Sequence, residues 1–305
     1  KAAMDRVVVA QLEEGDIHEN EAATFLGTAL TSPNVAPQRA DAGRVNLTAT
    51  SDGVCKIDRQ LIIELNTIDE AITVATVTPN LSVKAGQLIA TIKIIPFATQ
   101  MAALTQACAI AEKKPIKVLS YKSCNAALIL THSAGTEPNE KLNKKAVSTL
   151  EWRLMQRGAR LTKVETVVHD ESTLSSCLNS LSNHEGPIFI LGVSAIVDRR
   201  DVVPAAIETC GGTINKLGMA VDPGNLTLMA ELHGRPVIGL PGCARSPKLN
   251  GFDWVLDHIL TGQSFDDEKW AAMSVGGLLK EIKSRPKRRE PDSQTSKLKI
   301  TAAVL

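Results

Sequence analysis

Short apolar runs alternate with longer amphipathic stretches through the second half of the chain. The apolar, β-branched runs predict strands at residues 126–130, 162–168, 188–192, 226–230 and 236–240. The stretches between them predict helices at residues 139–157, 171–181, 201–210 and 248–260. Because strands and helices alternate, we expect an α/β domain whose mostly parallel sheet is covered by helices on both faces.

The first third of the chain has a different pattern and predicts a smaller β-rich domain. Strands are expected at residues 7–9, 71–77 and 87–95, helices at 21–30 and 98–113, and residues 61–68 are ambiguous. Val83–Leu88 resembles the strand-turn-strand of barrel-sandwich domains such as biotinyl carriers, but the carrier lysine motif is absent, which favours a scaffold. The predicted divisions are 1–36 (strand and helix), 37–122 (barrel-like domain), 123–265 (α/β domain) and 266–305 (helix, basic linker and a further strand).

Composition narrows the class of protein. Hydrophobic residues make up 44% of 305 residues, which is enough for large cores and excludes global disorder. Aromatic residues make up only 3% of the chain and the net charge is +1, so specific binding of nucleic acid is not expected. Residues 280–305 nevertheless carry eight Lys and Arg against three Asp and Glu, which is typical of a solvated linker.

Cysteine spacing and hydropathy indicate the compartment. The six cysteines form no CxxC pair, so neither a disulfide framework nor a zinc site is expected and a reducing cytoplasm fits best. No apolar run approaches the roughly 18 residues that span a bilayer, and no secretory signal is visible.

Ligands of such sheets bind beyond the carboxyl ends of the strands, which selects four loops. The first loop carries small and hydroxyl residues that can cradle a phosphate, although an ordinary turn is an equally good interpretation. Its candidate binding residues are Thr131, Ser133, Gly135 and Thr136. In the second loop Asp170 either caps the next helix or holds Mg²⁺.

The third loop combines acids with arginines after an apolar strand. Gly192 and Ser194 are candidate binding residues, Asp198 and Asp201 are candidate catalytic carboxylates, and Arg199 and Arg200 could clamp a phosphate. A surface salt-bridge cluster is the alternative. The fourth region supplies tight turns that let backbone approach a ligand. Its candidate binding residues are Pro223, Gly224, Asn225, Pro241, Gly242, Cys243 and Ser246.

Together these loops resemble the molybdopterin-binding domain of molybdenum cofactor biosynthesis proteins. The resemblance rests on Gly192-Val193-Ser194, on Asp201 with Asp198 as its near rival, on Pro223-Gly224-Asn225 and on Leu240-Pro241-Gly242-Cys243. It implies a molybdopterin-binding fold that takes molybdopterin or its nucleotide form. It also implies Mg²⁺-dependent adenylylation or molybdate insertion, with Asp170 and Asp201 as metal and phosphate ligands, and a homo-oligomer.

The resemblance extends to bacterial proteins that fuse this domain to a C-terminal nucleotidyltransferase. Residues 299–305 look like the first strand of that transferase, so we expect the chain to be a piece of a longer protein. Three features depart from the family pattern: Leu191 replaces its first glycine, His132-Ser133-Ala134 replaces an acidic loop, and Cys243-Ala244 replaces Asn-Pro. Pterin binding is therefore the leading hypothesis. The alternatives are a non-catalytic oligomerisation scaffold for the fused transferase and an accessory to a cytidylyltransferase.

Overall fold

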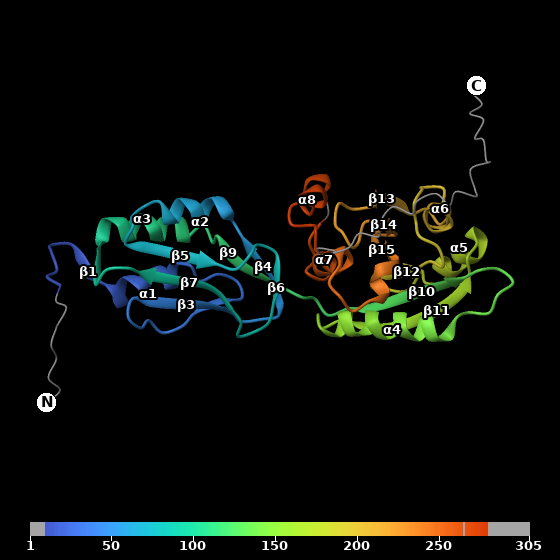
Figure 1. The fold of residues 1–305 in the computed structure, drawn as a ribbon, viewed down its shortest axis with the longest axis horizontal. Coiled ribbons are helices and arrows are strands. Elements are labelled where there is room, and N and C mark those ends of the chain that lie inside the picture. The colour runs from blue at the N-terminus through green and yellow to red at the C-terminus, as the bar shows by residue number, and fades with distance from the viewer. Residues whose placement is uncertain (1–9, 265, 280–305) are drawn as a thin grey trace, which may run out of the picture.

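The computed structural model describes residues 10–264 and 266–279. These residues form two units that lie end to end along the long axis of the molecule (Figure 1). The expected strand at 7–9, the basic linker and the expected transferase strand at 299–305 lie outside the described residues. No helix within the described ranges is long and apolar enough to cross a membrane.

The N-terminal unit, residues 10–121, builds one core from three antiparallel sheets and three helices. Its elements are β1 (Asp16–His18), α1 (Glu19–Ala29), β2 (Val35–Pro37), β3 (Arg44–Ala49), β4 (Gly53–Ile57), α2 (Arg59–Asn66), β5 (Ile72–Thr76), β6 (Leu81–Val83), β7 (Leu88–Ile94), β8 (Ala98–Gln100), α3 (Met101–Ala111) and β9 (Ile116–Ser120). The strand orders are β2-β3-β7-β5, β6-β4-β9 and β1-β8. The ambiguous segment at 61–68 is helical, because Asp58 caps α2 through the Leu61 amide.

The C-terminal unit is the expected α/β domain. Its elements are β10 (Asn125–His132), α4 (Glu140–Met155), β11 (Arg160–Val168), α5 (Glu171–Ser180), β12 (Ile188–Leu191), α6 (Val202–Thr209), β13 (Thr213–Leu217), β14 (Leu228–Leu232), β15 (Arg235–Gly239), η1 (Gly242–Arg245), α7 (Gly251–Leu260) and α8 (Asp267–Ala272). The sheet order is β11-β10-β12-β15-β14-β13, in which the first four strands are parallel and β14 and β13 are antiparallel additions. The prediction of a mostly parallel sheet is thus confirmed.

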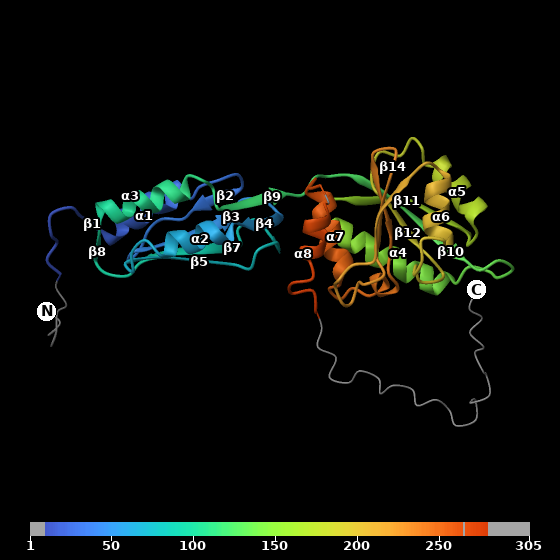
Figure 2. The same cartoon turned by 90° about the horizontal axis from the view of Figure 1, so that it is seen from above.

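Side chains of the central strand divide between two cores on opposite faces of the sheet. Ala126, Leu128 and Leu130 join the core formed with α4 and α7, whereas Ala127 and Ile129 join the core formed with α5 and α6. This alternation follows from the two-residue repeat of a strand. Figure 2 shows the helices on both sides of the sheet, as the sequence predicts.

Two strands of the C-terminal unit, β13 and β14, differ from the sequence expectation. The sequence pattern missed β13, a five-residue edge strand. The strand expected at 226–230 lies two residues later, as β14. The hairpin turn falls on His233 and Gly234, which both have positive φ (53° and 75°), as a tight two-residue hairpin requires.

Candidate functional site

Three of the parallel strands bring their carboxyl ends together around one imidazole. Thr131 is near the end of β10, His169 directly follows β11, and Ser194 lies in the loop after β12. The Val193 amide donates to Thr131 Oγ1 at 3.0 Å, Thr131 Oγ1 lies 2.8 Å from His169 Nδ1, and His169 Nε2 lies 3.1 Å from Ser194 Oγ. The three side chains form one continuous hydrogen-bonded chain.

The direction of this chain follows from the burial of Thr131. Its side chain is almost buried, at 8% exposure, so its hydroxyl hydrogen needs an acceptor. The Val193 amide can only donate, so among its described partners His169 Nδ1 accepts that hydrogen. The single N–H of the neutral His169 ring is then at Nε2, which donates to Ser194 Oγ. The exposed Ser194 hydroxyl is left to donate its own hydrogen outward, to a ligand.

Partial burial favours the neutral form of the His169 ring. Partial burial lowers the pKa of His169 below its usual range, and the carboxylates of Asp201 and Asp170 oppose that shift only in part. A neutral ring can accept at Nδ1 and donate at Nε2, as the chain of hydrogen bonds requires.

A titration of His169 tests this direction. We expect its pKa to lie below 6.5, the ordinary value for histidine, and to rise in Thr131→Val, because that variant removes a donor that favours the neutral ring. The measurement is the pH dependence of the His169 ring resonances by NMR. A lower pKa in Thr131→Val would instead mean that Thr131 accepts from Nδ1–H.

Arg245 supplies a positive charge at the same edge of the sheet. It closes η1, donates from Nη2 to the Gly192 carbonyl at 3.1 Å, and has a buried Nε without a hydrogen-bond partner among the described residues. Burial lowers the pKa of Arg245, and within the described ranges no acidic group offsets this effect. A half-buried guanidinium without a counter-ion is suited to a bidentate anion such as phosphate.

Gly192 lies between Arg245 and the His169 chain. A Cβ at this position would lie 2.8 Å from the Ser194 carbonyl oxygen and 3.5 Å from His169 Cε1. The turn therefore has no room for a side chain.

The predicted carboxylates serve the loops in which they lie. Asp201 Oδ2 accepts from the amides of Val197 and Asp198, at 2.6 and 2.9 Å. Asp170 Oδ1 caps α5 through the Thr173 amide at 2.8 Å, and this backbone hydrogen bond lowers the pKa of Asp170. The described residues include no group of three or more His, Cys, Asp or Glu that could hold a metal ion.

The arginines of the third loop are engaged elsewhere. Arg200 pairs with Asp198 at 2.9 Å on the surface, and Arg199 reaches towards the Ile214 carbonyl at 3.5 Å. Both border a shallow basin beside β13. Arg245, which the sequence did not single out, is the arginine that borders Gly192.

The first loop folds into a turn of its own. Thr136 donates through its amide and its hydroxyl to the Ser133 carbonyl, and Gly135 adopts φ +71°. His132 Nδ1 lies 2.9 Å from the Thr136 carbonyl oxygen. Thr131, which precedes this turn, is the member of the predicted loop that the structure joins to His169.

The fourth region lies at the same edge, because Leu228 pairs with Gly239 at the end of β15. The Pro223 carbonyl accepts from the Gly251 amide at 2.8 Å, and Gly224 packs against Gly251, so Pro223–Asn225 lies against the start of α7. Pro241 and Gly242 begin η1.

Two residues of this region, Cys243 and Ser246, take part in packing and hydrogen bonding within the protein. Burial raises the pKa of Cys243, so its thiol stays protonated and is no activated nucleophile. The Ser246 carbonyl accepts from the buried side chain of Arg153 at 2.6 Å.

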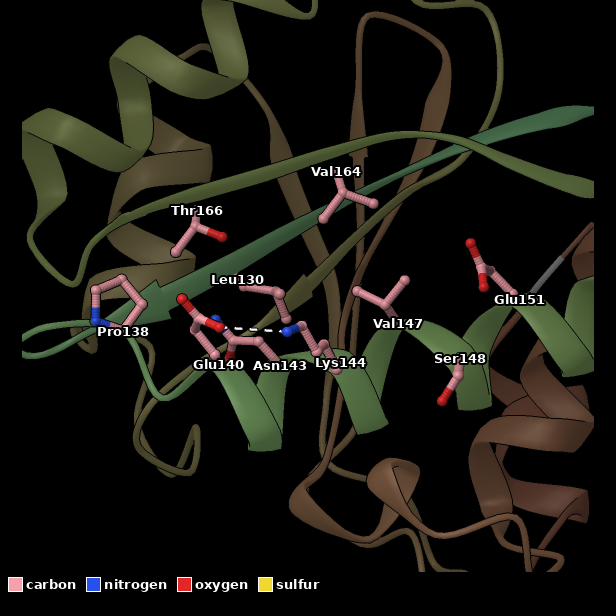
Figure 3. A pocket seen from close by; sticks show the side chains of 10 residues that line it. All are labelled: Leu130, Pro138, Glu140, Asn143, Lys144, Val147, Ser148, Glu151, Val164 and Thr166. Atoms are coloured by element: carbon pink, nitrogen blue, oxygen red, sulfur yellow. Dashed lines mark hydrogen bonds and ion pairs between the residues drawn. The ribbon is translucent and has the colours of Figure 1, made fainter.

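A separate groove of about 460 Å³ lies between α4 and the edge strand β11 (Figure 3). Leu130, Val147 and Val164 form its apolar floor, and its cation Lys144 pairs with Glu140 at 3.3 Å, while Glu151 adds a further negative charge. Because Lys144 is paired, the described lining of this groove offers no cation comparable to Arg245 at the loop edge.

Comparison with known proteins gives structural likeness only. No family model and no curated protein sequence matches the chain. Among solved structures, a molybdopterin biosynthesis MoeA protein from Pyrococcus horikoshii is similar over 80% of this chain and 79% of its own, with 13% identity and a TM-score of 0.34. Molybdenum cofactor biosynthesis protein B is similar over 47% of this chain and 96% of its own, with 15% identity and a TM-score of 0.34. The protein CinA from Thermoplasma acidophilum is similar over 41% of this chain and 90% of its own, with 13% identity and a TM-score of 0.31.

Proposed function

We propose that the C-terminal unit binds molybdopterin or its nucleotide form and acts in molybdenum cofactor biosynthesis. The observation that carries the proposal is the Arg245 guanidinium, which is half-buried beside Gly192 and Ser194 and has no counter-ion in the part of the chain that the structure describes. The motifs around it, Gly192-Val193-Ser194 and Leu240-Pro241-Gly242, are those that resemble the molybdopterin-binding family.

The chemistry of this edge suits the phosphate of such a ligand. The guanidinium offers a planar fork to two phosphate oxygens, and the Ser194 hydroxyl offers a further donor whose orientation is fixed by His169 and Thr131. The absence of a side chain at Gly192 leaves the backbone open to a close approach.

The resemblance to the molybdopterin-binding family implies Mg²⁺ at the same edge. Asp170 and Asp201 are the carboxylates that would hold it together with a substrate phosphate, and when bound the ion would offset phosphate charge. Both aspartates lie close enough to raise the pKa of His169 electrostatically, so they border one site. Adenylylation or molybdate insertion is the reaction class that this arrangement would serve.

Calorimetric titration with molybdopterin under anaerobic conditions tests the proposal. We expect Arg245→Met to weaken binding at least about tenfold, because a hydrogen-bonded charge pair contributes about 1.5–3 kcal/mol. Ser194→Ala removes one neutral donor, and we expect a smaller loss of affinity. Arg160→Met is the matched control, since it removes an exposed arginine at the start of β11.

Two outcomes would contradict the proposal: no binding by the unaltered protein, or equal affinities for Arg245→Met and Arg160→Met. Thermal unfolding of each variant shows whether it is folded. A folded protein that does not bind would favour the oligomerisation scaffold instead.

A further inference from the structure

A second cavity, of about 440 Å³, lies between the two units. Figures 1 and 2 both place α7 and α8 on the side of the C-terminal unit that faces β4 and β6. Lys56, Asn80 and Leu81 line the cavity from the N-terminal unit, and Trp254, His258 and Lys269 line it from the C-terminal unit. None of Thr131, Ser194 and Arg245 lines it, so it is distinct from the loop edge.

Hydrogen bonds near this cavity join the N-terminal unit to the C-terminal unit. Tyr121 donates its hydroxyl to Asp257 Oδ1 of α7 at 2.6 Å and lies 2.7 Å from Ser82 Oγ of β6. The Lys122 amide donates to the Leu260 carbonyl at 2.7 Å. The cavity is thus formed by two walls that the chain itself joins.

The cavity carries positive charge that the protein does not fully compensate. Lys56 is half-buried, and its ammonium is 2.5 Å from Asn80 Oδ1, an amide oxygen rather than a carboxylate. Burial lowers the pKa of Lys56, and repulsion from Lys269 and Lys117 lowers it further. The half-buried Lys56 ammonium therefore faces a second positive charge, that of the exposed Lys269, on the opposite wall of the cavity.

Among the other ionisable groups nearby, Asp266 offsets the charge of Lys269, whereas the charge of Lys56 has an amide oxygen as its hydrogen-bond partner. Burial lowers the pKa of His258, which Lys56 and Lys269 also repel, and its Nε2 donates to the Ser264 carbonyl at 3.1 Å. Asp266 pairs with Lys269 at 2.5 Å. Asp257 pairs with Arg157 at 2.5 Å, so its charge is already balanced.

We propose that this cavity binds a phosphate monoester that has a flat apolar body. Lysine ammonium groups bind phosphate as point charges, and one dianion in the cavity would offset the charge of Lys56 and be attracted by Lys269 at the opposite wall. Trp254, Leu249 and Met273 supply apolar wall for the body of the ligand. The volume lies within the range of small-molecule sites. Such a ligand would contact both units at once and so stabilise their arrangement.

Calorimetry with 1-naphthyl phosphate as the probe tests the proposal. We expect it to bind, and we expect 1-naphthol and inorganic phosphate to bind at least about tenfold more weakly, because each lacks one half of the recognised group. Lys56→Met and Lys269→Met should each weaken binding of the ester about tenfold. The exposed Lys145→Met should bind as the unaltered protein does. Lys56 and Lys269 lie outside the loop edge, so failure here is separable from failure of the pterin proposal.

The stability of the ligand-free protein gives a second readout. Lys56→Met removes a repelled charge, so its midpoint of thermal unfolding without ligand should be no lower than that of the unaltered protein, while the rise on adding 1-naphthyl phosphate should be lost. Lys269→Met loses its pair with Asp266 and serves as the second variant. No binding of the ester, equal affinity for 1-naphthol, or unchanged affinity in both lysine variants would overturn the proposal.

Discussion

Replacing Arg153 with methionine is expected to destabilise the C-terminal unit by about 3–5 kcal/mol, because it leaves the buried Asp253 carboxylate with the longer 3.7 Å contact to Arg157 in place of its 2.8 Å pair. Arg153 is fully buried on α4, with Nε 2.8 Å from Asp253 Oδ1 of α7. Its other donors bind the carbonyls of Ala244, Ser246 and Lys248 at 2.9, 2.6 and 3.1 Å. The side chain therefore holds the loop that carries η1 between two helices.

Denaturant unfolding of Arg153→Met, with Arg160→Met as an exposed control, measures this cost. The double variant Arg153→Met with Asp253→Asn should recover part of it, since asparagine can still accept from the Asn250 amide without leaving a buried charge. A loss below about 1 kcal/mol in the single variant would contradict the assignment. Because η1 carries Arg245, we also expect the single variant to bind pterin more weakly than its folded fraction explains.

Much of the α/β unit could be predicted because its local signals agree. The alternation of Ala126 to Leu130 between two faces, the cap at Asp170 and the positive φ of Gly158 (+72°) each depend on residues close in sequence. Such features need no knowledge of which strands become neighbours.

The central residue of the candidate site could not be predicted in the same way. His169 meets Thr131 because β10 and β11 pair with a register shift between Ala126 and Ala127, and nothing in the sequence marks that irregularity. His132, the other histidine beside this site, points at the carbonyls of its own turn. Two loop histidines of similar local context thus have different roles because of strand register.

Arg245 was missed for a related reason. Its position depends on the tertiary packing of η1 against α4, where Arg153 donates to the Ala244 and Ser246 carbonyls and pairs with Asp253. None of the described residues pairs with Arg245 as a counter-ion. By contrast, Arg199 and Arg200 stand beside acids in sequence and were expected at the site, but local pairing with Asp198 holds Arg200 on the surface. An arginine that is already paired with a neighbouring carboxylate binds an anion more weakly than an arginine without such a pair.

Gly224→Ala is expected to lower the free energy of unfolding by about 3 kcal/mol. A loss of this size would show that packing against the protein, and not contact with a ligand, requires glycine in this turn. Gly224 has φ +139°, and an added Cβ would lie 2.7 Å from the Gly251 nitrogen and 2.8 Å from its Cα. Both atoms are backbone at the start of α7, so neither can rotate away. The clash would push the Pro223 turn off the helix that it caps.

Gly135→Ala is the matched control, because Gly135 also has positive φ (+71°) but nothing within 4 Å of an added Cβ. It should cost only about 1 kcal/mol, the strain of a left-handed alanine. Equal losses in the two variants, measured by chemical denaturation, would show that the contact with α7 contributes nothing. A larger loss in Gly224→Ala would mean that this turn, which lies at the predicted binding edge, owes its glycine to the helix behind it. Ligand contact at this edge would then rest on Gly192, Ser194 and Arg245.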